Sequence, residues 1–192
     1  MRLTDWDERY LKGEYSPEEP HQLLSTALRR LKPGRALDVA CGVGRHAIFL
    51  AGAGWAVTAV DSSRVGLEVA RKRAQIRSVK IETVEADLER HEFSIAPGGY
   101  DLICIFYYLQ RDLFPPLKNG LRPGGTLVAA IHMNDDQVAE QRMNPDYLLA
   151  AGELRSYFND WKIEFYREGR WDGPEHNHCD AEIIACKPEP DS

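Results

Sequence analysis

The stretch ALDVACGVGRHA, residues 36–47, joins three local patterns within one short segment. Its first part, residues 37–40, is an apolar run that is long enough for a buried strand and too short for a helix. Gly42 and Gly44 come next, and because glycine has no Cβ, a turn there can be tight and its backbone can approach a ligand closely. Apolar residues then recur at helical spacing from Val43 onward. The stretch predicts a strand, a glycine turn and a helix whose free N–H groups face one point, which is typical of a nucleotide-cofactor site.

The residues before this stretch predict a helix and an aromatic arm. Residues 19–32 carry an apolar stripe at helical spacing, residues 16–19 supply capping groups, and Pro33-Gly34 ends the pattern. Residues 1–18 mix Trp6 and Tyr10 with charged side chains. Such an arm either packs its aromatic rings on the body of the protein or closes over a ligand as a lid, and the sequence leaves both readings open.

The residues after the glycine turn alternate between strand and helix patterns. Further strands are predicted at residues 55–60, 79–84, 100–106 and 126–131, with helices at residues 62–76, 113–119 and 147–158. Two closing strands, residues 161–167 and 180–186, have no helix between them and should pair as an antiparallel hairpin. We therefore predict an α/β fold: a Rossmann-like, seven-stranded, mostly parallel sheet with helices on both faces and a C-terminal antiparallel hairpin.

Length and composition limit the class of protein. The chain has 192 residues, 43% of them hydrophobic, and a net charge of −6. This predicts a single domain spanning residues 1–192, with the arm at 1–18 and a cofactor-binding core at 33–186. An acidic chain without a long basic run lacks the usual footprint for nucleic acid, and no apolar stretch is long enough for a membrane span. We expect a cytoplasmic protein with reduced cysteines, monomeric or weakly dimeric.

Acidic residues lie at or near the ends of three of the predicted strands. In a parallel sheet with this topology a ligand binds beyond the carboxyl ends of the strands. Asp61 ends the second strand, where a carboxylate can accept both hydroxyls of a ribose, and Ser62 follows it. Asp87 ends the third strand, where it can accept from the amine of a base while Leu88 covers a ring face. Asp38 is buried below the turn and requires a partner, either a turn N–H group or a ligand ammonium.

These motifs together resemble a known family. Residues 38–46 (DVACGVGRH), Asp61, residues 86–88 (ADL) and residues 121–127 (LRPGGTL) are similar to the successive motifs of class I S-adenosylmethionine-dependent methyltransferases. Within that superfamily, residues 6–10 (WDERY) and residues 152–161 resemble the tellurite-resistance methyltransferases and their small-molecule relatives. The family usually has glycine where this chain has Ala40. The loop at residues 169–178 also lacks the His-Arg pair associated with the tellurite group.

The resemblance implies S-adenosylmethionine as the cofactor and a role for each matching position. The turn would hold the methionine part of the cofactor, with Asp38 near its ammonium group, Asp61 on the ribose, and Asp87 and Leu88 around the adenine. The full set of expected cofactor-binding residues is Trp6, Tyr10, Asp38, Ala40, Cys41, Gly42, Gly44, Arg45, His46, Asp61, Ser62, Asp87, Leu88, Phe106 and Tyr107.

The acceptor of the methyl group is expected to be a small molecule such as a thiol or a chalcogen oxyanion. Methyl transfer requires alignment and a desolvated pocket, and it requires a base only if the acceptor must first lose a proton. The expected catalytic residues are Tyr107, which the resemblance puts beside the methyl group, with His132 and His176 as candidate bases. Arg111 and Arg170 can hold an anionic acceptor. No metal site is expected, because no second cluster accompanies the histidines of the closing loop.

Two other functions remain compatible with the glycine turn. The spacing Gly42-x-Gly44-x-x-Ala47 also satisfies the fingerprint of a nicotinamide-dependent oxidoreductase, although Asp38 and Asp87 count against it. The chain could also be a cofactor-binding protein without activity. A comparison of S-adenosylhomocysteine binding with NADH binding distinguishes a methyltransferase from an oxidoreductase. A panel of methyl acceptors, tested for turnover, distinguishes an active enzyme from a cofactor-binding protein without activity. The aromatic segment after the fourth strand, Phe106-Tyr107-Tyr108, differs from the Asn-Pro-Pro-Tyr type expected for methylation of bases or proteins.

Overall fold

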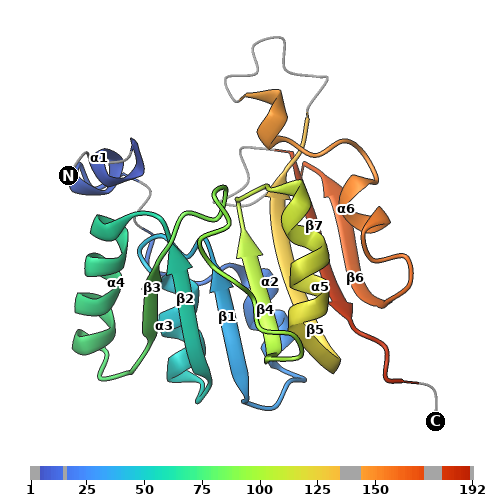
Figure 1. Ribbon diagram of the computed structural model, residues 1–192, viewed down its shortest axis with the longest axis horizontal. Coiled ribbons are helices and arrows are strands. Elements are labelled where there is room, and N and C mark those ends of the chain that lie inside the picture. Colours follow the sequence, from blue (N-terminus) through green and yellow to red (C-terminus); the bar gives the residue numbers. More distant parts are fainter. Residues whose placement is uncertain (1–4, 15–16, 135–143, 171–178, 191–192) are drawn as a thin grey trace.

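The sheet has the predicted architecture. The computed structural model describes residues 5–14, 17–134, 144–170 and 179–190, and within them seven strands form one sheet in the order β3-β2-β1-β4-β5-β7-β6 (Figure 1). Neighbouring strands from β3 to β5 pair in parallel, and β7 pairs antiparallel with both β5 and β6. The strands are β1 (Arg35–Val39), β2 (Ala56–Asp61), β3 (Glu82–Glu85), β4 (Tyr100–Phe106), β5 (Leu121–His132), β6 (Lys162–Gly169) and β7 (Asp180–Cys186). The predicted Rossmann-like sheet with a closing hairpin is confirmed.

Helices cover both faces of this sheet (Figure 1). One face packs against α2 (Gln22–Leu28), α3 (Arg45–Gly52) and α4 (Arg64–Ile76), and the other against α5 (Phe114–Gly120) and α6 (Glu153–Ser156). The N-terminal helix α1 (Asp5–Leu11) packs against α4. Two short 3-10 helices, η1 (Arg111–Leu113) and η2 (Pro145–Tyr147), lie in the connections.

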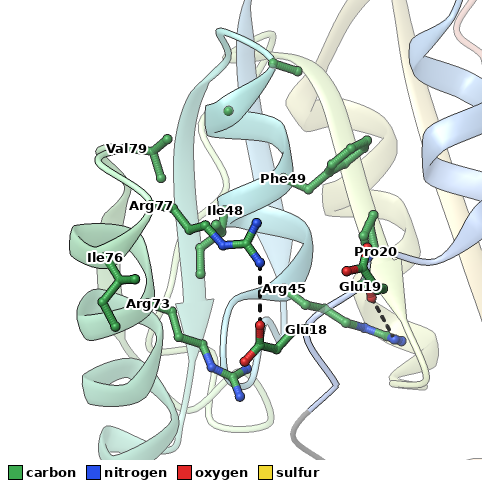
Figure 2. Close-up of a pocket in the computed structure, with 12 residues that line it drawn as sticks. Glu18, Glu19, Pro20, Arg45, Ile48, Phe49, Arg73, Ile76, Arg77 and Val79 are labelled. Carbon is green, nitrogen blue, oxygen red and sulfur yellow. Dashed lines mark hydrogen bonds and ion pairs between the residues drawn. The ribbon is translucent and has the colours of Figure 1, made fainter.

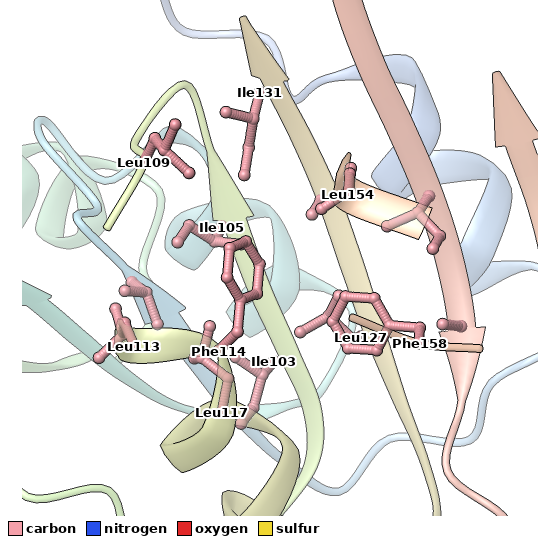
Figure 3. Close-up of a cluster of buried hydrophobic side chains, with 14 of the residues drawn as sticks. Ile103, Ile105, Leu109, Leu113, Phe114, Leu117, Leu127, Ile131, Leu154 and Phe158 are labelled. Atoms are coloured by element: carbon pink, nitrogen blue, oxygen red, sulfur yellow. The ribbon is translucent and has the colours of Figure 1, made fainter. Parts of the chain in front are cut away.

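The two faces of the sheet bury separate apolar clusters. The cluster under α5 and α6 contains Phe114 and Phe158, whose rings meet edge to face (Figure 3). Phe114 also stacks on Tyr157, with ring centroids 4.0 Å apart. The other cluster contains residues of α2, α3 and the sheet, among them Leu24 and Leu50, both fully buried. Because β1 and β4 are buried on both faces, the strands between the clusters read as continuous apolar runs in the sequence.

Two predicted helices differ from the structure. The helix predicted at residues 147–158 is wrong in extent: the structure has η2 and the single turn α6 there. Gly152 adopts φ +74°, and the Leu149 N–H donates to the His132 carbonyl, so pairing with the end of β5 replaces the helix. The helix predicted at residues 19–32 is shortened to α2, whose N-cap is His21 and not a residue of 16–19. The His21 Nδ1 accepts from the Leu23 N–H at 3.2 Å.

Among the described helices, none is both long and apolar enough to cross a lipid bilayer.

Candidate cofactor site

The glycine turn leaves the carboxyl end of β1 with three residues in left-handed conformation. Ala40, Gly42 and Gly44 have φ of +52°, +53° and +78°. At Gly44, which caps the N-terminus of α3, a Cβ would lie 2.6 Å from the Cβ of Ala70 on α4, so only glycine fits. Ala40 adopts a conformation that costs a residue with a side chain about 1–2 kcal/mol and that glycine adopts freely.

Asp61 lies at the centre of the site, at the end of β2. One carboxylate oxygen accepts from the Gly42 N–H at 2.7 Å, and the other accepts from the Ser63 N–H at 2.8 Å. Its side chain is buried, and burial raises the pKa of the carboxyl group above its ordinary value. The carboxylate therefore links the glycine turn to the start of α4, and each oxygen keeps a second lone pair for a further donor. Ser62, between Asp61 and the N-cap Ser63, is half-buried.

Asp38 is held from within the protein. Its Oδ2 accepts from the Ala47 N–H in the first turn of α3 at 2.9 Å, and its Oδ1 accepts from the Cys104 thiol at 3.4 Å. Burial raises the pKa of Asp38 to about 7. Of the two kinds of partner that the sequence allowed for Asp38, the structure shows a backbone N–H. Cys41, also buried, donates its backbone N–H to the Val60 carbonyl, and burial raises the pKa of its thiol.

Asp87 and Leu88 follow β3 at the same edge of the sheet. The Asp87 Oδ1 accepts from the N–H groups of Glu89 and Arg90, and its Oδ2 lies 3.3 Å from the Arg90 Nε. Leu88 is buried, and its carbonyl accepts from the side-chain amide of Gln110. The carboxylate of Asp87 is partly exposed, so it remains accessible to a ligand while it organises its own turn.

The N-terminal helix α1 lies against this edge. The Asp7 Oδ1 accepts from the Ser63 hydroxyl at 2.6 Å and from the Val65 N–H at 3.1 Å, which caps the start of α4. Tyr10 packs on the turn so closely that a Cβ on Gly42 would come 2.5 Å from its hydroxyl oxygen. Burial and the nearby Asp61 raise the pKa of the Tyr10 phenol. Trp6 stacks on Tyr10 at 5.8 Å and is 44% exposed.

Aromatic and imidazole rings line the ends of β4 and β5. Phe106 stacks on His46 with centroids 4.0 Å apart, and burial lowers the pKa of His46, so its imidazole is neutral. Tyr107, with φ +59°, stacks on His132 at 4.7 Å. The Nδ1 of His132 lies 2.5 Å from the Oδ1 of Asp180 on β7.

Two predicted arginines serve other contacts. Arg111 binds both carboxylate oxygens of Glu153, at 2.7 and 3.1 Å, and two backbone carbonyls, so it holds α6 in place. The Arg45 guanidinium reaches the Glu19 carbonyl at the rim of a groove of about 500 Å³ (Figure 2). This groove lies between α3 and α4 and is lined by neither Asp61 nor Asp87, so it is separate from the glycine turn. Arg45 also lies 5.9 Å from the Tyr107 ring.

The structure brings most of the predicted cofactor residues to one edge of the sheet, and it adds partners that the sequence analysis missed. These partners are Asp7, Cys104 and Asp180. The predicted catalytic residue His176 falls outside the described residues. In the part of the chain that is described, no group of three or more histidine, cysteine or carboxylate side chains is arranged to hold a metal ion.

Comparisons with known proteins identify the family to which this chain is similar. A profile of the family described as "Tellurite resistance protein TehB" matches residues 4–181. A curated relative from Haemophilus influenzae, named as a probable S-adenosyl-L-methionine-dependent methyltransferase TehB, is 24% identical over 169 residues, covering 84% of this chain and 57% of the relative. A protein of Eikenella corrodens named Hemagglutinin 1 is 28% identical, covering 83% of this chain and 54% of its own. The chain thus spans about half the length of these relatives.

Solved structures show the same fold. The crystal structure of TehB from Haemophilus influenzae superimposes with a TM-score of 0.76 at 22% identity, covering 94% of this chain and 67% of that one. The profile match, residues 4–181, spans most of the arm, the glycine turn and the strand β6, and it confirms the resemblance to the tellurite-resistance group. The chain belongs to the tellurite resistance protein TehB family.

Proposed function

We propose that this chain binds S-adenosylmethionine at the carboxyl ends of β1, β2 and β3 and transfers its methyl group to a small molecule. The observation that carries the proposal is the glycine turn with its two buried carboxylates: Asp61 accepts from Gly42 in the turn, and Asp38 accepts from Ala47 at the start of α3. The family membership and the names of relatives such as the Haemophilus influenzae protein support the same activity.

The residues present fit this cofactor. The turn at Gly42 offers backbone without a Cβ, and Asp61 offers lone pairs beyond those that it uses for Gly42 and Ser63. Asp87 and Leu88 offer an acceptor and an apolar surface where the adenine would lie. Because Tyr10 packs directly on Gly42, a ligand that enters this turn must move α1 or bind beneath it.

When bound, S-adenosylmethionine supplies an electrophilic methyl group on a positively charged sulfur. The chain's contribution is then to align an acceptor with that methyl group and to exclude water. Tyr107 and His132 at the ends of β4 and β5 form one wall of the acceptor side, and α1 with Trp6 and Tyr10 forms a cover. Aromatic rings with a few polar groups suit a small acceptor.

Calorimetric titration tests the cofactor assignment. We expect the protein to bind S-adenosylhomocysteine and to show no heat with NADH. Asp61→Asn should weaken the binding of S-adenosylhomocysteine at least tenfold, since a charge-assisted hydrogen bond contributes about 1.5–3 kcal/mol. Asp112→Asn, a change to an exposed carboxylate of η1, is the control and should bind like the wild type.

Three outcomes would contradict the proposal. Binding of NADH in preference to S-adenosylhomocysteine would support the oxidoreductase alternative. Unchanged affinity in a folded Asp61→Asn protein would refute the role of Asp61, and its fold must be checked by thermal unfolding because Asp61 also holds Gly42 and Ser63. The protein could also bind S-adenosylmethionine but form no S-adenosylhomocysteine with any acceptor in a panel of thiols, halides, chalcogen oxyanions and small amines. This result would indicate a cofactor-binding protein without activity.

A further inference from the structure

The ends of β5 and β7 bring one histidine and one carboxylate into direct contact. His132 is the last residue of β5 and Asp180 the first of β7, and the antiparallel register places them opposite each other. The Nδ1 of His132 lies 2.5 Å from the Oδ1 of Asp180. The two residues are 48 positions apart, so only the pairing of the strands brings them together.

The contact with the buried carboxylate of Asp180 indicates which nitrogen of His132 carries the proton. Asp180 is 1% exposed, and its Oδ2 has no hydrogen-bond partner among the described residues. An ionised carboxylate can only accept, so Nδ1 must be the protonated nitrogen of a neutral His132 and Nε2 presents its lone pair at the opposite edge of the ring. A carboxylate with no other described donor also stabilises the positive charge that His132 acquires when it takes up a proton.

The ring of His132 lies on the acceptor side of the cofactor site. Tyr107 stacks against it with the two rings inclined by 25°, and Arg45, the first residue of α3, lies 5.9 Å from the same Tyr107 ring. The glycine turn leads directly into α3. The ring of Tyr107 thus lies between His132 and Arg45, the first residue of α3. The side chain of His132 is 16% exposed, so it is not sealed in the core.

The other charged groups near the pair have partners of their own. Glu182, the next inward-facing residue of β7, accepts from Arg167 at 2.9 Å and lies 3.6 Å from the Nε2 of His21. Cys179, next to Asp180, accepts from the Met133 N–H through its backbone carbonyl. Among the described residues, Asp180 is the carboxylate that contacts His132.

We propose that His132 is a general base that removes a proton from the methyl acceptor, with Asp180 as its positioning residue. The acceptor class that follows is a small molecule with an ionisable X–H group, a thiol or an acidic hydroxyl, and not a halide or an oxyanion that is already charged. His132 Nε2 takes the proton, the heteroatom forms a bond to the methyl carbon, and the electron pair of the broken C–S bond goes to sulfur. The products are the methylated acceptor, S-adenosylhomocysteine and a proton that His132 releases to solvent. This inference rests on the proposed methyltransferase function.

The kinetic test compares acceptors of different acidity. An aromatic thiol that is ionised at neutral pH requires no base, whereas an aliphatic thiol of similar size is mostly protonated and does. We expect His132→Gln to lower kcat/KM for the aliphatic thiol 10²- to 10⁴-fold and for the aromatic thiol less than about threefold. Raising the pH until the aliphatic thiol ionises should restore much of the lost activity. The same comparison is made with phenol and nitrophenol.

A matched control exists on the surface. His91 also lies beside a carboxylate, Asp112, at 3.5 Å, but both side chains are more than half exposed. His91→Gln should therefore leave both acceptors unaffected. Equal losses for the two thiols in His132→Gln would indicate a structural role for this side chain and would overturn the inference. Turnover restricted to halides or oxyanions, or no turnover of any protic acceptor by a protein that binds S-adenosylhomocysteine, would also overturn it.

A second readout requires no turnover. Nitrogen-15 NMR of labelled histidine should show the Nδ1–H tautomer for His132 in the wild type. Asp180→Asn offers an amide that can donate to Nδ1, and this should shift His132 toward the Nε2–H tautomer and lower activity on the aliphatic thiol. An unchanged tautomer in Asp180→Asn would refute the positioning role. Titration of each variant with S-adenosylhomocysteine separates this failure from failure of the proposed function, because a wild type that does not bind it refutes the latter alone.

Discussion

Asp38 is a carboxylic acid in the middle of the sheet, and its ionisation should make the stability of the protein depend on pH. Burial raises its pKa to about 7 in the folded protein from an ordinary value of 3.8. Well below pH 3.8 both folded and unfolded chains carry the proton. As the pH rises from 4 to 7 the unfolded chain loses its proton first, so the folded state becomes less favoured, and the loss levels off above pH 7.

The prediction concerns the variant Asp38→Asn, which cannot ionise. Its free energy of unfolding relative to the wild type should rise between pH 4 and pH 8 by an amount on the order of 4 kcal/mol, since one pKa unit corresponds to about 1.4 kcal/mol. Urea unfolding at a series of pH values measures this difference. Asp112→Asn, at an exposed position, should follow the wild type at every pH. Parallel curves for Asp38→Asn and the wild type would show that Asp38 is ionised in the folded protein.

At the residue scale, the sequence predicted correctly the position of residues that lie at the end of their own strand. Asp61 and Asp87 were placed at strand ends from short apolar runs, and both lie there. Asp180 was missed because nothing near it in the sequence marks it as a partner of His132. Once the closing hairpin is assumed, its register is the one signal that could have suggested this pair.

The helix α3 depends on a glycine at its entrance and tolerates a side chain at its end. Gly44→Ala forces a left-handed alanine and brings a Cβ 2.6 Å from the Cβ of Ala70. We expect a loss of about 2–4 kcal/mol in the free energy of unfolding. Gly52→Ala, in the last turn of α3 with open space around it, should gain about 0.5–1 kcal/mol. Urea denaturation measures both, and a Gly44→Ala protein as stable as the wild type would contradict the described turn.

The helix α1 should open without unfolding the sheet. Asp7→Ala removes the acceptor of the Ser63 hydroxyl and the Val65 N–H, and losing such a cap costs about 1 kcal/mol, which corresponds to roughly fivefold faster amide exchange. Hydrogen exchange should therefore increase in α1 and stay unchanged in β1 and β4. Glu8→Ala, an exposed change on the same helix, is the control.

A deletion variant, together with this exchange experiment, decides whether the arm is a lid or part of the core. We predict that deleting residues 1–14 lowers turnover and the affinity for S-adenosylhomocysteine far more than it lowers the melting temperature of the free protein. A large loss of melting temperature without ligand, or faster exchange throughout the sheet in Asp7→Ala, would make the arm part of the core. The lid would then be excluded.

At the scale of the whole molecule, charge governs which partners can approach. The chain carries a net charge of −6, and Arg77, one of the arginines that line the groove between α3 and α4, lies 3.5 Å from the carboxylate of Glu18. Such a surface should repel a nucleic-acid backbone. We expect labelled methyl groups to appear in small acceptors and not in transfer RNA, DNA or cell protein. Label recovered in transfer RNA at low salt, with no small product, would refute the small-molecule assignment.

The sequence by itself determined the parallel sheet, the glycine turn, the closing hairpin and the family. Each depends on a short-range pattern: apolar runs for the strands, glycine spacing for the turn, and the missing crossover helix for the hairpin. The length of the helix before β6 was not predictable, because the apolar residues from 147 to 158 have helical spacing but the Leu149 N–H bonds to the end of β5. Tertiary pairing there outweighed local preference.

Tertiary structure alone decided how the site is assembled. Asp7 caps α4 across 56 positions of sequence, and His132 meets Asp180 across 48. These contacts exist because α1 folds back on α4 and because β7 pairs with β5 in one register, and neither arrangement leaves a periodic trace in the chain. Local physical preferences specify elements, whereas the contacts between distant side chains depend on the packing of the whole sheet.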